Sequence, residues 1–228
     1  MHNVRPYQFF NVLEAPPRQR VVQTTLPSRR GSGGLTILEM TVIMAALRVV
    51  EARQVFEIGT FLGSTTLNLA LNIPDDGKVF TLDLDEQHAG EVRQDVADAP
   101  LTGIHLASKS SLDFIGSPVE HKIKMLTGDS TKFDFSPWHG SVELVFIDGG
   151  HDFDTVKSDT ENAFRLANKD RLSCVLWHDY RNRDYSGLTY YLDELSRSEP
   201  VIHIEDTMLC AWFNEPDEYV LPRILSAT

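Results

Sequence analysis

The stretch that decides the fold of this chain is VFIDGGH, residues 145–151. The apolar run of residues 144–147 is short and bulky, which is typical of a central strand buried on both faces of a parallel sheet. The two glycines after it allow the backbone to turn sharply. Asp148 and His151 are therefore expected on the same rim, although an isolated Asp-Gly pair is more often only a turn. The neighbouring strands decide between these interpretations.

Composition limits the classes of protein to which the chain can belong. Its 228 residues suffice for one well-buried α/β domain, and 42% apolar with 24% charged residues is typical of a globular protein. The net charge, 21 − 33 = −12, disfavours nucleic acid or an anionic membrane as the main partner, because both attract clustered Lys and Arg. Cys174 and Cys210 lie in apolar contexts without metal-ligand spacing, and no signal peptide precedes them. We therefore expect reduced core cysteines and a cytoplasmic location.

Residues 1–34 differ from the rest because they have no sustained hydrophobic period, carry four prolines and end in a joint rich in Gly, Ser and Arg. We interpret them as an N-terminal arm and residues 35–228 as the main domain. Tyr7, Phe9 and Phe10 form an aromatic cluster that favours docking of the arm on its own domain, on a partner in a homodimer, or over an active site. The sequence leaves these three options open.

A second informative stretch, VFEIGTFLGSTT at residues 55–66, predicts a short strand, a glycine-bearing loop and a helix that starts near Ser64. Gly59 permits a tight turn out of the strand, and Gly63 lets a ligand approach the backbone beside the unpaired amides of the helix N-terminus. The spacing is G-x-x-x-G rather than G-x-G-x-x-G, and Glu57 would repel a pyrophosphate. The loop therefore favours a cationic or hydroxyl-rich ligand, with a purely structural turn as the alternative.

Acidic residues also end the next predicted strands. Residues 79–85 contain an apolar strand with Asp83 near its end, about 20 residues past the glycine loop, where a doubly wound nucleotide site places the carboxylate that binds ribose hydroxyls. Residues 122–126 are predicted to form a third strand, and Asp129 and Ser130 after it could hydrogen-bond the edge of a nucleobase. Two coupled signals, the glycine loop and Asp83, are harder to attribute to chance than one.

The strand predicted at residues 172–177 ends in His178 and Asp179. Adjacent parallel strands present their carboxyl ends side by side over one crevice, so we expect these two residues to converge with Asp148, with His151 beside them. A buried group of carboxylates is costly without a cation. The same residues are therefore candidates for binding a metal ion.

The remaining pattern predicts a lid, a hairpin and the helices. Residues 99–121 are irregular, with interleaved glycine and proline, and we expect them to be an insertion that caps the site and helps select the substrate. An antiparallel hairpin is predicted at residues 201–205 and 208–213. Thr36 and Glu39 fit a capping box at the start of the first helix. Helices are predicted at residues 37–50, 64–71, 86–97, 155–167 and 186–197.

From residue 37 to residue 213 this ordered series of strand-end motifs resembles the class I S-adenosylmethionine-dependent methyltransferases, especially the small-molecule O-methyltransferases related to catechol and macrolide-sugar O-methyltransferases. The resemblance implies an α/β, Rossmann-like, doubly wound sheet of seven mostly parallel strands that finishes in a C-terminal antiparallel hairpin. It also implies S-adenosylmethionine as cofactor. The implied cofactor contacts, all near strand ends, are Glu57, Gly59, Thr60, Gly63, Asp83, Asp129, Ser130 and Asp148.

The resemblance further implies a reaction. The hydroxyl oxygen of a small-molecule acceptor would attack the sulfonium methyl group, with His151 as general base and Asp148 as the second catalytic residue. Asp148, His178 and Asp179 stand at the positions of ligands to a divalent metal, magnesium or manganese. His178 departs from the family, which usually has a carboxylate there. Because magnesium prefers oxygen ligands, an imidazole favours manganese, iron or zinc, or leaves His178 uncoordinated.

The sequence also bears on other functions. The glycine spacing and Glu57 disfavour an oxidoreductase with a nicotinamide cofactor. A non-catalytic S-adenosylmethionine-binding module would not need Asp148, His151 and Asp179. A related enzyme of the cephalosporin-hydroxylase-like branch has a similar fold and strand-end acids, and it stays open as an alternative. Methylation of nucleic acid is disfavoured because the Asn/Asp-Pro-Pro-Tyr/Phe motif is absent after the fourth strand and the net charge is acidic.

Overall fold

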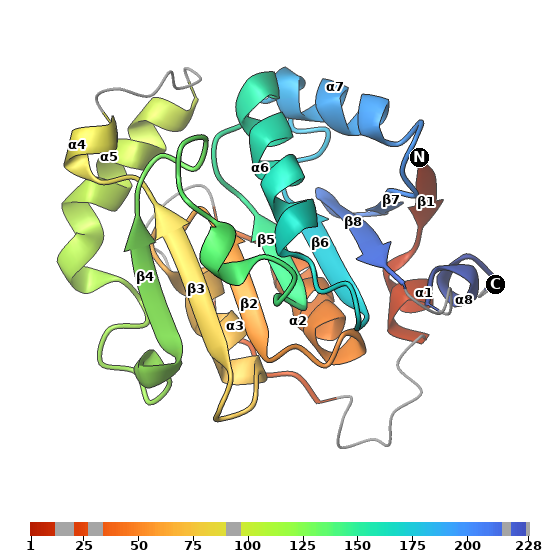
Figure 1. Cartoon of the computed structure of the whole chain (residues 1–228), viewed down its shortest axis with the longest axis horizontal. Helices are drawn as coiled ribbons and strands as arrows, with labels where there is room; N and C mark the ends of the chain where they lie inside the picture. Colours follow the sequence, from red (N-terminus) through yellow and green to blue (C-terminus); the bar gives the residue numbers. More distant parts are fainter. Residues whose placement is uncertain (12–20, 27–33, 90–96, 216–219, 227–228) are drawn as a thin grey trace.

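A computed structural model describes residues 1–11, 21–26, 34–89, 97–215 and 220–226 (Figure 1). The strands are β1 (His2–Val4), β2 (Gln54–Ile58), β3 (Lys78–Asp83), β4 (Ile123–Thr127), β5 (Leu144–Ile147), β6 (Ser173–Trp177), β7 (Ile202–Ile204) and β8 (Leu209–Asn214). The helices are α1 (Pro6–Asn11), α2 (Ile37–Val49), α3 (Ser64–Asn72), α4 (Glu86–Ala89), α5 (Asp98–Ser108), α6 (Phe153–Leu166), α7 (Ser186–Leu195) and α8 (Val220–Ser226).

The strands form one sheet in the order β1-β7-β8-β6-β5-β2-β3-β4. All neighbours are parallel except β8, which is antiparallel to both β6 and β7. After β1, at one edge of the sheet, the chain enters the middle at β2, winds outward through β3 and β4, and then returns to β5 on the other side of β2. The predicted doubly wound, mostly parallel sheet and its antiparallel C-terminal hairpin are confirmed.

The register brings four predicted strand tips to one level. Ile147 of β5 pairs with Ile58 of β2 and with Trp177 of β6, and Ile58 also pairs with Leu82 of β3. The residues that follow these pairs therefore leave the sheet side by side at its carboxyl edge. The order reverses between β2 and β5, which is where open α/β sheets form their ligand crevice.

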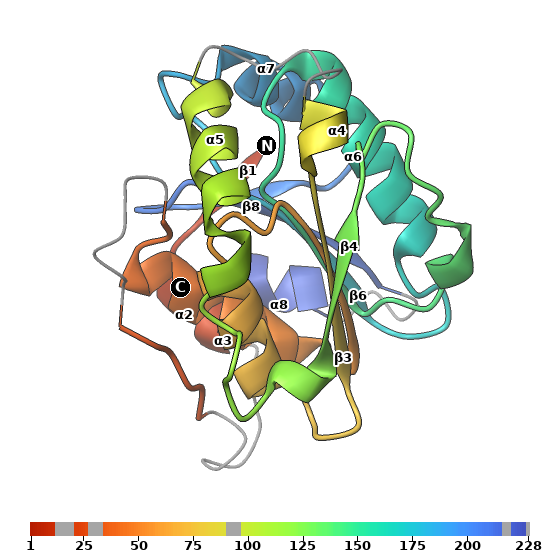
Figure 2. The ribbon, with the colours of Figure 1, turned by 90° about the vertical axis from the view of Figure 1, so that its left-hand side faces the viewer.

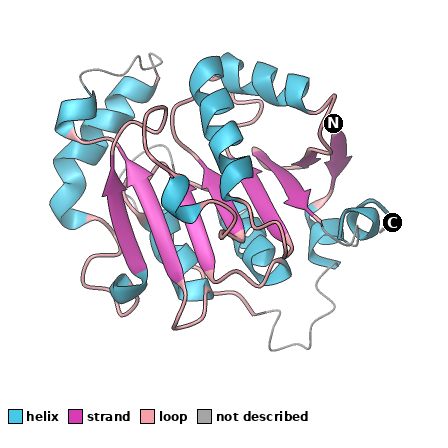
Figure 3. Cartoon of the chain, viewed as in Figure 1, coloured by secondary structure: helices cyan, strands magenta, loops and turns pink. Residues whose placement is uncertain are grey.

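Helices cover both faces of the sheet, as Figures 2 and 3 show. Because side chains alternate along a strand, Leu144 and Phe146 of β5 join the apolar cluster that contains residues of α1, α2, α3 and α8, whereas Val145 and Ile147 join the cluster with residues of α6 and α7. A strand with all four side chains buried is what the unbroken apolar run of β5 predicts.

The predicted capping box of α2 is confirmed. The Thr36 hydroxyl accepts a hydrogen bond from the backbone N of Glu39 at 3.2 Å, and the Glu39 carboxylate accepts one from the backbone N of Thr36 at 2.8 Å. Glu39 is buried, unlike most capping glutamates, and it has a second role in the site described below.

The sheet has eight strands instead of the seven that the family resemblance implies. The extra strand, β1, pairs in parallel with β7, and the following α1 buries Phe9 completely in the core. The described start of the arm thus docks on its own domain, through pairs that join residues about 200 positions apart. Residues 12–20 and 27–33 lie outside the described residues, and a homodimer formed through the arm stays a prediction.

One other local prediction was wrong, and one helix was missed. Residues 98–108 form helix α5 rather than irregular chain, because Pro100 lies in the first turn of the helix, where proline is tolerated. Helix α8 follows the hairpin and was not predicted. The helix predicted at residues 86–97 is described only as α4, since residues 90–96 lie outside the described residues. Within the described part of the chain, no helix combines the length and apolar character needed to cross a bilayer.

Candidate active site

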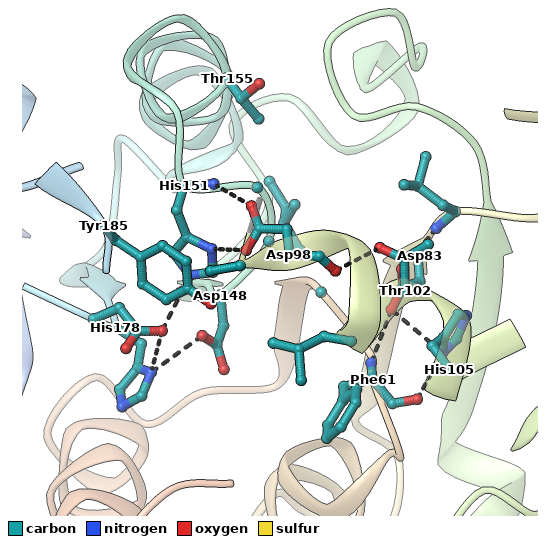
Figure 4. A pocket seen from close by; sticks show the side chains of 18 of the residues that line it. Phe61, Asp83, Asp98, Thr102, His105, Asp148, His151, Thr155, His178 and Tyr185 are labelled. Atoms are coloured by element: carbon teal, nitrogen blue, oxygen red, sulfur yellow. Dashed lines mark hydrogen bonds and ion pairs between the residues drawn. The ribbon is translucent and has the colours of Figure 1, made fainter. Parts of the chain in front are cut away.

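A cavity of about 620 Å³ opens at the carboxyl edge of the sheet (Figure 4). Its lining comes from the loops after β2, β3, β4, β5 and β6, from the start of α2, and from α5. Ligand sites of this size and place are usual in doubly wound folds. The strand-end residues predicted from sequence therefore share one hollow.

The glycine loop, residues 59–63, passes directly over the end of β5. Gly59 has φ +101°, and a Cβ there would lie 2.0 Å from the carbonyl oxygen of Asp148. The backbone N of Asp148 donates to the Ile58 carbonyl at 2.8 Å, and that of Gly59 donates to the Leu82 carbonyl at 2.9 Å. Gly59 is therefore required by the crossing of two strand ends, whatever ligand the loop binds.

Gly63 packs against another segment of the chain and not against open space. It has φ +78°, and a Cβ there would lie 2.7 Å from the ring of Phe114, in the segment after α5. We expected this glycine to admit a ligand, but Phe114 occupies that side of it. Gly63 is not among the residues that line the cavity, and its predicted cofactor contact stays a prediction.

Glu57 lies behind the glycine loop, fully buried and outside the cavity lining. Its carboxylate accepts hydrogen bonds from the hydroxyls of Thr66 and Thr81, and Thr81 also bonds the hydroxyl of Thr60 at 2.6 Å. Burial raises the pKa of Glu57 to about 8, against the two hydroxyl donors that lower it. Glu57 thus ties the strand end to α3 and β3, and Thr60 takes part in the same network.

Asp83 faces the cavity, but its carboxylate already accepts hydrogen bonds from the backbone. Its Oδ2 accepts hydrogen bonds from the backbone N atoms of Thr60 and Phe61, both at 2.8 Å, and its Oδ1 accepts one from Leu84 at 2.7 Å. A carboxylate offers about four acceptor positions, so roughly one remains for a ligand hydroxyl. Asp83 therefore shapes the glycine loop in addition to any contact with a ribose.

The loop after β4 is held by Asp129. Burial would raise the pKa of this carboxyl, but hydrogen bonds from Thr131 and Lys132 outweigh burial and lower it. The Thr131 hydroxyl donates at 2.7 Å, and Nζ of Lys132 lies 3.1 Å away. Asp129 and Ser130 line the cavity, as predicted, just past the carboxyl end of β4. Contact with a nucleobase stays a prediction.

His151 lies between two carboxylates. Its Nδ1 is 2.7 Å from Oδ1 of Asp98, its Nε2 is 3.1 Å from Oδ2 of Asp179, and its ring stacks on Tyr185 with centroids 3.7 Å apart (Figure 4). Burial by itself would lower the pKa of His151, but the hydrogen bonds with Asp179 and Asp98 raise it to about 9. In this arrangement His151 holds a proton on both nitrogens at neutral pH.

Asp148, His178 and Asp179 form the predicted ligand group. One ligand atom from each lies within 4.8 Å of the others, and Nδ1 of His178 is 3.2 Å from oxygens of both carboxylates. The other ring nitrogen of His178 faces Oε1 of Glu39 at 3.5 Å. Asp179 has φ +63°, a left-handed conformation that Asp tolerates better than most residues.

Negative charge dominates the cavity. Its lining holds eight carboxylates and, among the residues that the structure describes, neither Lys nor Arg. The carboxylates are those of Glu39, Asp83, Asp98, Asp129, Asp148, Asp152, Asp179 and Asp184. Such a lining favours a cationic ligand and a bound cation, and it opposes polyphosphates.

Sequence reasoning missed three buried residues of the site: Glu39, Asp98 and His105. Glu39 was noticed only as a helix cap. Asp98 and His105 are seven residues apart, a spacing that places both on one face of a helix, but this signal has meaning only once residues 98–108 are known to be helical. The residues predicted at the ends of β3, β4, β5 and β6 line one cavity, whereas Glu57, Thr60 and Gly63 support its wall from behind.

The geometry of the sheet and of its strand ends first defines a class of protein. An open parallel sheet with a glycine loop after its first central strand, and with acidic residues at the following strand ends, is a nucleotide-cofactor-binding α/β fold. Residues 56–180, more than half of the chain, match the family described as "Methyltransferase domain". The chain belongs to this family, and the predicted resemblance to class I methyltransferases is confirmed.

Relatives and solved structures agree with this assignment. The chain is 26% identical over 111 residues to caffeoyl-CoA O-methyltransferase 2 of Populus trichocarpa and to caffeoyl-CoA O-methyltransferase 3 of Nicotiana tabacum. Each match covers 46% of this chain but only 38% of the relative.

The fold is similar to that of two solved O-methyltransferases. The first is TomG of Streptomyces achromogenes in complex with SAM, with a TM-score of 0.52 and 16% identity over 80% of this chain and 82% of that one. The second is an O-methyltransferase of Bacillus cereus in complex with SAH, with a TM-score of 0.52 and 16% identity over 90% of each chain. At this identity the likeness shows the fold.

The buried Glu57 predicts a pH dependence of stability. The folded protein keeps a proton on Glu57 up to about pH 8, whereas the unfolded chain releases it near the ordinary pKa of 4.5. Stability from this group is fully present below pH 4.5 and is lost as the pH rises toward 8, because deprotonation then favours unfolding by up to about 1.4 kcal/mol per pH unit. Glu57→Gln, which cannot titrate, should gain about 2 to 4 kcal/mol relative to the wild type as the pH rises from 5 to 8. Urea unfolding of both proteins at pH 5 and pH 8 measures this gain. If the free energy of unfolding changed equally with pH in the wild type and in Glu57→Gln, a buried proton on Glu57 would be contradicted.

Proposed function

We propose that the chain is an S-adenosylmethionine-dependent O-methyltransferase that acts on a hydroxyl group of a small molecule. The observation that carries the proposal is the shared cavity, which joins the glycine loop and Asp83 on one side to the cluster of Asp98, Asp148, His151, His178 and Asp179 on the other. The names of the relatives, caffeoyl-CoA O-methyltransferases, support the same class of reaction.

S-adenosylmethionine fits the residues present. The acidic lining suits its sulfonium and ammonium charges, and Asp83 has one acceptor position left for a ribose hydroxyl. In the reaction, the O–H bond of the acceptor and the C–S bond of the cofactor break, an O–C bond forms, and the proton passes to the enzyme. The cavity positions both reactants, which supplies much of the rate enhancement of such a displacement.

His151 is the proposed general base. Its Nδ1 is held by Asp98, so Nε2 is the nitrogen that can take the acceptor's proton. Nε2 is available only when the Asp179 carboxylate turns away from it, since the ion pair with Asp179 otherwise keeps a proton there. Stacking on Tyr185 keeps the imidazole plane fixed while the proton moves.

A divalent metal also fits the donor set of Asp148, His178 and Asp179, whose ligand atoms lie within 4.8 Å of one another. When bound, such an ion would lower the pKa of an acceptor hydroxyl and offset the charge of the surrounding carboxylates. The single imidazole favours manganese over magnesium.

The charge of the cavity restricts the acceptor. A coenzyme A thioester carries phosphates, and the described lining has no Lys or Arg to pair with them. We therefore propose a neutral or cationic acceptor, of the kind represented by sugars, catechols and polyketides. A panel of such acceptors, compared with the coenzyme A thioester of a matching phenol, tests this, and turnover of the thioester alone would contradict it.

The cofactor assignment predicts the effect of Asp83→Asn. Loss of the charge-assisted hydrogen bond should weaken binding of S-adenosylmethionine about tenfold, which corresponds to about 1.4 kcal/mol. Calorimetric titration measures this, with Asp170→Asn on the exposed loop before β6 as a matched control. A wild-type chain that does not bind the cofactor would refute the proposed function, and an unchanged affinity in Asp83→Asn would refute the role of Asp83.

The assignment of His151 as base predicts that His151→Gln loses turnover but keeps its affinity for the cofactor. We expect its kcat to fall at least about 100-fold, because a positioned base contributes two to four orders of magnitude, while the affinity for S-adenosylmethionine stays within about twofold. Methyl transfer to the acceptor panel and calorimetry measure the two quantities. A fully active variant would show that the proton leaves by another route.

The metal assignment predicts that Asp179→Asn binds Mn²⁺ at least about tenfold more weakly than the wild type. Asn keeps the left-handed backbone at this position, so the fold should be retained. Asp184→Asn, which removes a cavity carboxylate outside the ligand group, is the control. Titration followed by electron paramagnetic resonance measures Mn²⁺ binding, and equal affinities in all three proteins would rule out this site.

A further inference from the structure

Helix α5 extends from the His151 side of the cavity to the glycine loop, but none of its apolar side chains is fully buried. Of its eleven residues only Asp98 and His105 are buried, and both are polar. They are seven residues apart, so they share one face of the helix about 10 Å from each other along its axis. The docked position of α5 therefore depends on the contacts of these two side chains, one at each end.

Asp98 holds both the ring and the main chain of His151. Its Oδ1 is 2.7 Å from Nδ1 of His151, and its Oδ2 accepts a hydrogen bond from the backbone N of the same residue at 3.3 Å. A carboxylate at Nδ1 keeps the proton on that nitrogen and turns Nε2 toward Asp179, whose Oδ2 lies 3.1 Å away. His151 thus owes its orientation to a residue 53 positions earlier, on another element.

His105 holds the other end of α5 on the glycine loop. Its Nδ1 donates to the carbonyl oxygen of Phe61 at 2.6 Å and lies 3.5 Å from Oδ2 of Asp83. The backbone N of Phe61 in turn donates to Asp83 at 2.8 Å. His105, Phe61 and Asp83 therefore form a closed set of contacts at the point where the ribose of the cofactor is proposed to bind.

We propose that Asp98 is a positioning residue for His151, and that His105 couples this positioning to occupation of the cofactor half of the cavity through the rigid helix α5. The inference rests on the proposed function of His151 as base. A ligand that orders Phe61 and Asp83 stabilises the contact of His105 with Phe61. This contact keeps α5 docked, and the docked helix keeps Asp98 in contact with His151. The coupling is reciprocal, so loss of the His105 contact must also weaken binding of the ligand.

The Asp98 end is tested with Asp98→Asn. This variant keeps the size of the side chain but loses the charge that holds the Nδ1 proton. We expect kcat to fall at least about 100-fold, with KM for the acceptor and the affinity for S-adenosylmethionine within about twofold of the wild type. A purely structural role would alter binding and thermal stability together with kcat. An unchanged kcat overturns the positioning role.

The His105 end is tested with His105→Phe, which keeps a ring but removes the donor, and with His105→Asn, whose amide N can replace Nδ1. The readout is hydrogen exchange of the backbone amides of residues 102–108, which can bond within α5, with and without S-adenosylmethionine. The cofactor should slow this exchange in the wild type and in His105→Asn but not in His105→Phe, and His105→Phe should bind the cofactor about 5- to 10-fold more weakly. Ile104→Ala, on the exposed side of the same helix, should behave as the wild type.

The outcomes separate the two hypotheses. A wild-type chain that neither binds S-adenosylmethionine nor transfers its methyl group refutes the proposed function and the coupling with it. A wild-type chain that does both, with equal cofactor protection of α5 in wild type and His105→Phe, overturns the coupling alone. If His105→Phe does not fold, loss of protection in the folded His105→Asn variant overturns it.

Discussion

The rest of the site depends on the contact between the backbone of Gly59 and the carbonyl of Asp148. No Cβ fits there, and hydrogen bonds to the carbonyls of Ile58 and Leu82 lock three strand ends together at the same point. The glycine loop and the loop that carries Asp148 and His151 therefore begin from one crossing. This is why the glycine-loop side and the histidine side of the cavity are adjacent although they come from different strands.

Around that crossing the protein concentrates negative charge beyond what its own cations neutralise. The cluster of Asp98, Asp148 and Asp179 has two imidazoles between its carboxylates, and Glu39 adds a further charge behind His178. Burial makes unpaired charge expensive, so this arrangement suits a site completed by cationic ligands. The same property underlies the proposed preference for acceptors without phosphates, whereas the relatives are named for caffeoyl-CoA.

Two supports outside the strand tips hold the imidazoles in place. Glu39 joins the start of α2 to His178 and to the backbone N of Met208, and α5 joins His151 to the glycine loop through Asp98 and His105. Neither support is required by the sheet itself. The sheet fixes where the strand-end side chains meet, and these two elements fix the direction in which each imidazole presents its nitrogens.

The sequence by itself determined the central sheet and the strand-tip acids, because an apolar run of four to six residues and the carboxylate that ends it are neighbours in the chain. Only the tertiary structure decided which carboxylate faces which imidazole. Asp98 and His151 are 53 residues apart, and the pairing of β1 with β7 joins residues about 200 apart. Such contacts leave no local pattern, because they depend on how packed elements are placed in space. The same reason explains why Glu57 is a buried support behind the loop, although its position beside the glycines indicated a ligand contact.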